Sequence, residues 1–516
     1  MYFFKHVFFQ VLIIALSLNC IAQESELWKD FEQASKNGTE PILPDFSYSG
    51  YRYSEVPIPT VDFPLFDVTD YGAIANDSKS DKEAIKKAIK AASKNGEGII
   101  YFPKGKYDIN TDEDDTSDIT IISSNIVFKG EDQKNTILFF KNDLPPLDPN
   151  KLWSCPSAIK SSSIKSNKHL TKIVADSKRE TYSIQVGDAS AIKKNDWILI
   201  KVLNNSKDLI DYDLMSLKQE PEWISILNKG VQVNEIHQVE SVAGNTIVLV
   251  EPIHYDIQSK HNWEVTTFEH LENIGFENIT FEGNWTKEFV HHRSAQDDGG
   301  WDILTISESV NSWIKDCSFK NVTNCVNFST SAACTALNIA IEGNIGHNAI
   351  HASGSTGILM ANINDMAGMH HSVGVAGGST TNTVIWRSKY PSHTSFESHA
   401  SQPRCTLFDN VSGGFFQGRA GGARQNLPNH SQYLVLWNYE ETDAPEENFR
   451  FVATETWYWR FVPPIIVGFH GSGTTFQEDE VQVLESLGTP VKPESLFEEQ
   501  LKLRLGELPD WIKKLK

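Results

Sequence analysis

Histidine is concentrated in one part of the chain, and imidazole is the side chain best suited to proton transfer near neutral pH. Between residues 291 and 399 stand His291, His292, His347, His351, His370, His371, His393 and His399. Asn324, His347, His370 and His393 are each 23 residues apart. In a chain that repeats at this period, residues one repeat apart stack on the same face. The spacing therefore predicts a wall of imidazoles, in which His371 can take the place of His370.

A cationic group follows the histidines and consists of Arg387, Lys389, Arg404, Arg419 and Arg424. In residues 413–424 glycine and arginine alternate as they would not in a packed strand. Glycine lets a backbone approach a ligand closely, and a guanidinium group binds carboxylate or sulfate through paired hydrogen bonds. The residues that we expect to bind an anionic substrate are Arg404, Arg419, Arg424, His393 and His399.

These residue types suit β-elimination on a uronic acid. The reaction needs a group that neutralises the sugar carboxylate, a base that removes the neighbouring proton and an acid that protonates the leaving oxygen. The residues that we expect to transfer protons are His347, His370, His371 and Tyr390. Arginine, histidine or a divalent cation such as calcium can neutralise the carboxylate, and the sequence identifies no metal ligands.

Carboxylates form a rival site. Asp297, Asp298 and Asp302 lie in one short run, and Glu397 stands between His393 and His399. Two carboxyl groups with opposed pKa values are what glycoside hydrolysis needs. An ordinary turn or a calcium-binding loop accounts equally well for the aspartate run. Hydrolysis by these carboxylates is therefore the alternative to elimination.

The elements that must position these side chains begin near residue 66. Residues 66–73 and 99–107 are strand-like, and Ser80 and Glu83 form a capping-box pair between them. Apolar residues then recur at helical spacing at Ile85, Ala88, Ile89 and Ala92. Asn95–Gly96 supplies the left-handed residue that ends a helix. The segment predicts a strand, a short capping helix and a second strand.

This unit, which ends in Pro103–Lys104–Gly105, resembles the entrance of the pectate-lyase superfamily, and residues 125–131 and 136–138 are similar to its first coils. The resemblance implies an all-β fold, the right-handed single-stranded parallel β-helix. The family includes polysaccharide lyases and polygalacturonase-like carbohydrate-active proteins. The Gly-His-Gly pattern of polygalacturonases and the Asp-Pro-His-Asp string of alginate epimerases do not occur in this sequence.

A repeat becomes clear after residue 270. Strand-like segments begin near Ile274, Ile314, Leu337, Ile358, Val384 and Thr406. The last four intervals, between 21 and 26 residues, match one coil of a solenoid. The first interval is 40 residues, which predicts a loop around residues 284–300. Stacked coils bury the apolar face that each coil alone would expose.

We expect six segments along the chain. They are a signal peptide at 1–22, an extended leader at 23–60, the capped start of the β-helix at 61–164, a β-rich insertion at 165–262, the main β-helix with the active cleft at 263–470, and a C-terminal tail and cap at 471–516. The first segment places a lysine, an apolar run and small residues in the order of a cleaved secretory signal. We therefore expect a secreted or periplasmic protein without a membrane-inserted segment.

The composition limits the partners. The formal net charge is −21, which argues against nucleic acid. Local charge in a cleft still permits an acidic glycan. Five cysteines follow the signal segment without metal-type spacing, so buried free thiols are expected rather than a disulfide framework.

Taken together, the residues and the resemblance predict an exported, monomeric enzyme that cleaves an anionic, uronic-acid-containing polysaccharide, sulfated or not, by β-elimination. A close variant eliminates water from a uronate in an oligosaccharide. The alternatives are a glycoside hydrolase acting on an acidic glycan and a non-catalytic glycan-binding solenoid.

Overall fold

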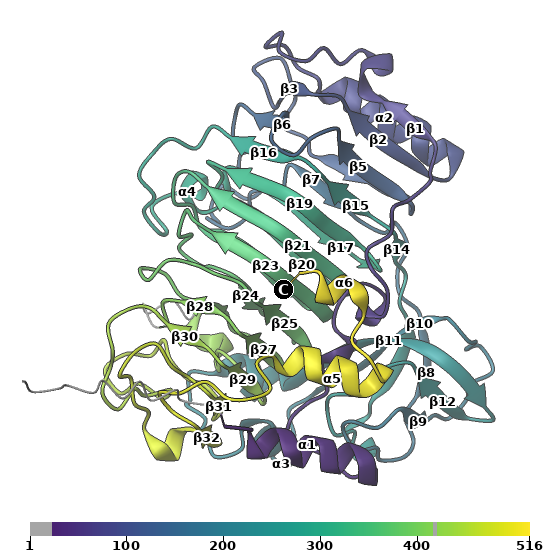
Figure 1. The fold of residues 1–516 in the computed structure, drawn as a ribbon. Coiled ribbons are helices and arrows are strands. Elements are labelled where there is room, and N and C mark those ends of the chain that lie inside the picture. The colour runs from purple at the N-terminus through teal and green to yellow at the C-terminus, as the bar shows by residue number, and fades with distance from the viewer. Residues whose placement is uncertain (1–22, 416–420, 516) are drawn as a thin grey trace, which may run out of the picture.

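The computed structural model describes residues 23–415 and 421–515. The expected signal peptide, residues 1–22, and Arg419 lie outside those residues. The chain winds into a stack of coils whose strands pair in parallel with those of the coils before and after (Figure 1). This is the right-handed single-stranded parallel β-helix that the sequence predicted.

The largest sheet runs along the whole stack. Within the described residues it contains β1 (Leu65–Asp67), β2 (Gly98–Phe102), β3 (Gly105–Ile109), β5 (Ile126–Gly130), β6 (Thr136–Phe140), β14 (Leu271–Glu272), β15 (Gly275–Glu277), β16 (Thr280–Gly283), β18 (Ser309–Val310), β19 (Trp313–Lys320), β21 (Ala332–Glu342), β23 (Thr356–Asp365), β25 (Thr383–Trp386), β27 (Thr406–Asp409), β29 (Leu434–Trp437), β31 (Ile465–Val467) and β32 (Val483–Glu485). The first coils have separate short strands where later coils have one long strand. The short strands β15 and β16 both pair with the long strand β19, which pairs with β21, and β21 pairs with β23.

The register of this sheet explains the core. One column of directly paired residues consists of Ile314, Ala336, Met360, Ile385, Phe408, Leu436 and Ile466. All of these side chains are buried inside the coils. Because side chains alternate between the two faces of a strand, each coil adds one layer to a continuous interior.

Asp and Asn side chains stack where the long strands bend. Asp316, Asn338 and Asn362 occupy positions one coil apart, and all three have positive φ. Asn338 Nδ2 donates to Asp316 Oδ1 at 2.8 Å, and Asn362 Nδ2 donates to Asn338 Oδ1 at 2.7 Å. Asn and Asp tolerate the left-handed region better than other residues with a side chain, so this ladder fixes the bend in successive coils.

A second parallel sheet carries most of the residues discussed below. It contains, from the N-terminal coils onward, β4 (Ile119–Ile121), β7 (Ile159–Ser161), β17 (Asp302–Ser307), β20 (Asn324–Ser329), β22 (Asn348–Ser353), β24 (Gly374–Ala376) and β26 (Glu397–Ser398). The loop before β17 carries the short helix α4 (Ala295–Gly299), which begins at the N-cap Ser294. A small further pair is β28 (Ser412–Gly413) with β30 (Glu440–Glu441).

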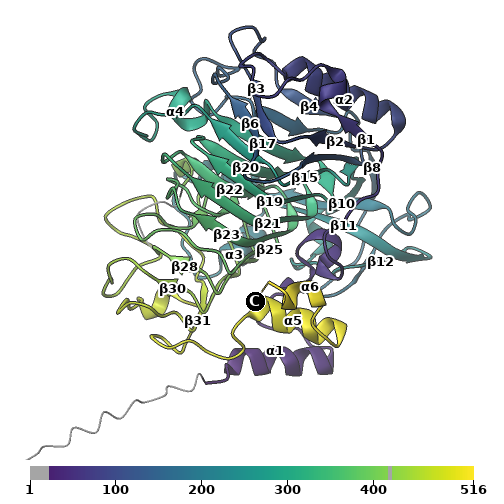
Figure 2. The same cartoon turned by 45° about the horizontal axis from the view of Figure 1, so that its top comes forward.

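The segment expected to be a β-rich insertion forms an antiparallel sheet beside the coils (Figures 1 and 2). Its strands are β8 (His169–Lys172), β9 (Ser183–Gln185), β10 (Trp197–Asn204), β11 (Val231–Ala243), β12 (Thr246–Leu249) and β13 (Glu264–Thr267), and helix α3 (Lys207–Leu214) follows β10. This sheet has its own apolar core, which Ala400, Leu427 and Val462 of the later coils join.

Helix α2 (Lys82–Asn95) covers the N-terminal end of the stack. Its buried face contains Ile85, Ala88, Ile89 and Ala92, as the spacing predicted. Gly96 ends the helix with φ of 97°. The N-cap position is Asp81, not Ser80; the Ser80 hydroxyl accepts from the Lys82 amide and donates to Asp114 in a neighbouring loop.

The two ends of the described chain cover the outward face of the large sheet. The leader forms helix α1 (Glu26–Asn37), so it is not extended as expected. The tail forms α5 (Leu496–Leu505) and α6 (Asp510–Lys513), which lie in front of the later strands in Figure 1. Both ends pack on outward apolar residues that include Trp386 and Trp437. The tail helices pack on this side face and help to bury these two tryptophans completely.

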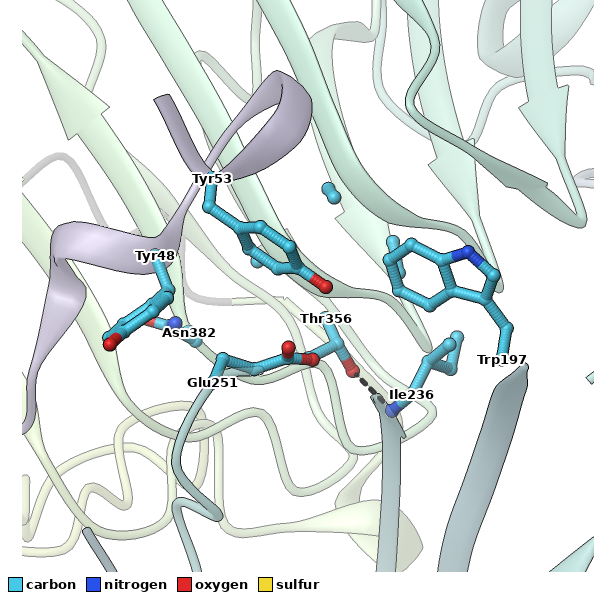
Figure 3. A pocket seen from close by; sticks show the side chains of 10 residues that line it. Tyr48, Tyr53, Trp197, Ile236, Glu251, Thr356 and Asn382 are labelled. Carbon is cyan, nitrogen blue, oxygen red and sulfur yellow. Dashed lines mark hydrogen bonds between the residues drawn. The ribbon is translucent and has the colours of Figure 1, made fainter. Parts of the chain in front are cut away.

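Leader, insertion and coils meet at one junction, shown in Figure 3. Tyr48 and Tyr53 of the leader, Trp197 and Glu251 of the insertion, and Thr356 of β23 surround a cavity of about 10 Å³. That volume holds about one water molecule. The junction is thus a packing contact and offers no room for a sugar.

Two further expectations concern the whole chain. Across residues 23–415 and 421–515, the helices are all too short or too polar to cross a lipid bilayer. Cys155, Cys317, Cys325, Cys334 and Cys405 are free, and all but Cys155 are buried. Burial raises the pKa of the four buried thiols, so they pack as small apolar groups.

Candidate functional site

Five imidazole rings converge beside the second parallel sheet, and we call these residues the histidine cluster: His291, His292, His347, His370 and His371. The first two lie between β16 and α4, the third just before β22, and the last two between β23 and β24. Three chain segments far apart in sequence therefore supply the cluster.

The rings of the cluster are close neighbours. The centroid of the His291 ring lies 3.6 Å from that of His292 and 4.2 Å from that of His370. The His371 ring lies 4.6 Å from His370 and 5.1 Å from His347. The structure thus brings together His347, His370 and His371, the three histidines expected to transfer protons.

The coil register explains how these rings meet. Asn324 pairs with Asn348, which in turn bridges to His371. The His371 amide donates to the His347 carbonyl at 2.8 Å. Asn324 and Asn348 are separated by one residue more than the predicted 23. The column that starts at Asn324 therefore continues through Asn348 and His371 and not through His347 and His370. His393 is exposed beside Gly368, away from the cluster.

Polar residues continue from the cluster across the sheet. One column of paired residues contains Asp302, Asn324 and Asn348. Asn324 Nδ2 donates to Asp302 Oδ2 at 3.0 Å. The next column pairs Asn327 with His351, then Gly374 with Glu397. The outward face of this sheet is therefore a strip of amides, imidazoles and carboxylates.

Hydrogen-bond acceptors orient the rings of His347 and His292. Nδ1 of His371 lies 2.6 Å from Oε2 of the fully buried Glu397, a close contact that is not aligned as a hydrogen bond. Nδ1 of His347 lies 2.8 Å from the carbonyl oxygen of Asp298, which can only accept, so Nδ1 carries the proton. Nδ1 of His292 lies 2.8 Å from Asp298 Oδ2.

Burial keeps the inner rings uncharged. Desolvation lowers the pKa of His347 and lowers the pKa of His371 well below its usual value. Burial also lowers the pKa of His351 to about 3. These three rings are therefore neutral near pH 7, with one nitrogen protonated and one lone pair available. His292 is exposed and His370 is partly exposed, so substrate can reach them.

The aspartate run shapes the loop that carries two of the histidines. Asp297 accepts hydrogen bonds from Arg293, from Ser294 and from the Val290 amide. Asp298 is buried and accepts from the amide and the ring of His292. Asp302 is tied to Asn324. Of the expected alternative carboxylates, Asp298 and Glu397 directly contact rings of the cluster.

Three expected site residues lie elsewhere. Tyr390 is in the core, where its hydroxyl lies 2.6 Å from that of Tyr439, and burial raises its pKa. Its ring points inward, so it does not face the groove that the sequence suggested. Arg404 is buried 3.3 Å from Asp213, and exposed Arg424 lies 3.3 Å from Glu222. Both arginines hold the insertion against the coils.

The glycine-rich segment approaches the site from one side. A Cβ placed on Gly421 would lie 2.6 Å from Glu397 Oε1 and 2.3 Å from His399 Cδ2. The backbone at Gly421 therefore packs closely against Glu397 and His399. His399 itself is partly buried, with Nδ1 2.7 Å from the Ala400 carbonyl oxygen.

Sequence reasoning missed the roles of His291, His292, His351 and Asn348. The signal for the first two was a His-His pair in the predicted loop. His351 and Asn348 become visible only once the strand register is known, because they stack on Asn327 and Asn324.

One group of side chains among the described residues has the arrangement of a metal site. Ligand atoms of His291, His347 and His371 all lie within 4.8 Å of one another. Three imidazoles are a donor set for a transition-metal ion.

Comparison with known proteins agrees with the fold. Residues 65–177 match a family described as rhamnogalacturonase A/epimerase, pectate lyase-like, and residues 368–515 match a domain of unknown function (DUF4955). Among curated proteins, alginate lyase 7 and mannuronan C5-epimerase AlgE3, both of Azotobacter vinelandii, are each 33% identical over 73 residues. That stretch is 14% of this chain and only 8% and 4% of those two proteins.

Among solved structures, the tailspike protein gp49 of Pseudomonas phage LKA1 aligns with a TM-score of 0.44 at 13% identity. The alignment covers 78% of this chain and 64% of the tailspike.

Proposed function

We propose that this chain, which folds as a pectate-lyase-like right-handed parallel β-helix, cleaves an anionic, uronic-acid-containing polysaccharide by β-elimination. The observation that carries the proposal is the convergence of five imidazoles beside one outward face of the coils. The matches to an alginate lyase and a mannuronan epimerase support an acidic polysaccharide as the substrate class. The proposal includes export of the protein as a monomer.

The chemistry fits the cluster. A neutral imidazole takes the proton from C5 of the uronate, and the C–H electrons form the C4=C5 double bond. The C4–O bond breaks, and a protonated imidazole gives its proton to the leaving oxygen. We assign these transfers to His370 and His292, which are both solvent-accessible. Asp298 holds the His292 ring in a fixed tautomer, as the acceptor of an acid–base histidine must.

Tyr390 has no part in this proposal, because its hydroxyl is buried against Tyr439. Arg404 and Arg424 are likewise assigned to the contact with the insertion. The proposed substrate-binding surface is the partly exposed portion of the polar strip, which includes Asn324 and Asn348.

The test is digestion of a panel of polyuronates, unsulfated and sulfated, followed by ultraviolet absorbance. Elimination forms a conjugated unsaturated uronate that absorbs, and His370→Ala should lower the rate by about 100-fold or more. His169→Ala, an exposed histidine of the insertion, is the matched control and should keep the wild-type rate.

Three other results would replace the proposal. New reducing ends without absorbance would indicate hydrolysis, with Asp298, Asp302 or Glu397 as the candidates. Exchange of the C5 hydrogen with solvent without chain cleavage would indicate epimerisation. Binding without turnover would indicate a glycan-binding solenoid.

A further inference from the structure

Neutralisation of the substrate carboxylate is a part of the reaction for which, among the described residues, Arg293, Arg404 and Arg424 are engaged elsewhere. Arg404 is paired with Asp213 and Arg424 with Glu220 and Glu222. In the cluster loop, Arg293 is held by two contacts to Asp297. With a formal net charge of −21, the chain needs a local positive charge for a polyuronate.

Three histidines of the cluster are arranged to bind a metal cation, which would supply such a positive charge. The ligand atoms of His291, His347 and His371 lie within 4.8 Å of one another. In a tetrahedral zinc site, nitrogens about 2.05 Å from the metal are about 3.4 Å apart. The rings therefore need to close by at most about 1.5 Å to reach that geometry. His291 lies in a partly exposed loop outside the strands of the sheet.

The surroundings of the rings are those of metal ligands. Nδ1 of His347 donates to the Asp298 carbonyl, and Nδ1 of His371 faces Glu397 at 2.6 Å. The His347 ring then has Nε2 left to coordinate. Metal-bound histidines nearly always use their second nitrogen in this way, on a carbonyl or a carboxylate.

The same residues argue for the kind of ion. Calcium takes six to eight oxygen ligands, and a set of three imidazole nitrogens does not suit it. Zinc and related divalent transition metals favour imidazole. The side chain of Glu397 is buried next to the site, with Oε2 2.6 Å from Nδ1 of His371.

We propose that His291, His347 and His371 bind one divalent transition-metal ion of the zinc type, with a further coordination position open to water or to the substrate. The inference deepens the proposed function, because it names what neutralises the uronate carboxylate. Metal binding itself does not depend on the reaction. In this arrangement His370 and His292, which lie beside the three ligands, remain available for proton transfer.

The test is metal binding by the full chain. Protein dialysed against a chelator is titrated with Zn²⁺ by calorimetry, and its metal content is measured after gel filtration. Co²⁺ is added in parallel, because its visible spectrum reports tetrahedral nitrogen coordination. We expect one equivalent of Zn²⁺ per chain and a tetrahedral Co²⁺ spectrum.

Variants locate the ion. His291→Ala and His371→Ala should each abolish stoichiometric binding, and Glu397→Gln should weaken it by roughly 10- to 100-fold. His169→Ala should bind like the wild type. His291 lies in a partly exposed loop, so its variant keeps the test valid if His371→Ala fails to fold. Absence of stoichiometric binding, or binding that survives both ligand variants, would overturn the inference.

Activity separates this inference from the proposed function. Elimination by the chelated, metal-free protein would leave the function standing and remove the metal from it. Stoichiometric metal binding at these histidines without elimination of any polyuronate would leave the metal site standing and remove the proposed function.

Discussion

At the scale of single residues, the site depends on side chains that fix one another's tautomers. Asp298 holds His292 through its carboxylate and His347 through its carbonyl, and Glu397 lies in close contact with His371. Both acidic residues are buried. In a low-dielectric setting such contacts are strong, and a ring that turns over presents the wrong nitrogen to the substrate.

Asp298→Asn tests this dependence. The amide presents a donor where the carboxylate accepted from the His292 ring, so the ring must flip or move. We expect the rate of polyuronate cleavage to fall about 10-fold or more, while the melting temperature changes little because the backbone contacts of residue 298 remain. Steady-state kinetics and a melting curve measure both. An unchanged rate would exclude His292 from proton transfer.

Gly421→Ala tests the close approach to the site. The new methyl group would meet Glu397 Oε1 at 2.6 Å and His399 Cδ2 at 2.3 Å. We expect activity to fall by roughly 10-fold and stability to fall by about 1–3 kcal/mol. Gly473→Ala is the control, since its nearest neighbour is 3.9 Å away. Equal behaviour of the two variants in kinetics and denaturation would show that this contact does not shape the site.

Residue type alone predicted the cluster only in part. The repeat spacing brought out His347 and His370 because coils of nearly constant length stack equal positions. The repeat spacing did not predict which way the side chains of Tyr390 and Arg404 point. Tyr390 points into the core, and Arg404 points at Asp213 of the insertion. Whether a side chain faces inward or outward depends on strand register, and one extra residue in a coil changes it.

At the scale of elements, the loop between β23 and β24 delivers His370 and His371. Asp365, the last residue of β23, accepts hydrogen bonds from the amides of Gly368 and Met369 and from the Ser372 hydroxyl. One buried carboxyl group therefore holds both ends of the loop. The coil repeat was readable from sequence, but this clamp was not, because it depends on the path of the loop.

The clamp predicts a pH dependence of stability. Burial raises the pKa of Asp365 to about 6, above its ordinary value of 3.8. The folded state thus binds this proton more tightly than the unfolded chain. Its stabilising contribution, at most about 3 kcal/mol, is complete below about pH 4 and is lost as the pH rises through about 6.

Asp365→Asn removes this titration. Melting temperatures of the wild type and the variant, measured from pH 4 to 8, should show a wild-type decline near pH 6 that the variant lacks. Other carboxyl groups contribute equally to both curves, so the difference reports Asp365. Parallel curves would contradict the assignment.

At the scale of the whole molecule, the β-helix is a scaffold covered on one side and polar on another. Helices α1 and α5 close the outward face of the large sheet, and the second sheet presents the polar strip. The repeat and the entrance motif predicted the solenoid, because stacking is a local periodic signal. The sequence did not show that the tail covers a side face, because that depends on the outward tryptophans of several coils together.

The overall charge predicts an unusual salt response. A chain with formal net charge −21 repels a polyuronate at long range. The screening length falls from about 30 Å at 0.01 M salt to about 8 Å at 0.15 M. We expect kcat/KM to rise over this interval, measured with an inert salt at fixed pH. A steep fall would mean that a basic surface dominates the encounter.

The central claim is elimination at the histidine cluster, and the most direct measurement is the mass of the products formed in water labelled with heavy oxygen. Elimination adds no water, so the account predicts product pairs whose masses sum to that of the substrate, with no label. His370→Ala should form these products about 100-fold more slowly or worse. Products that carry one labelled oxygen per cleavage, formed equally fast by His370→Ala, would contradict the account.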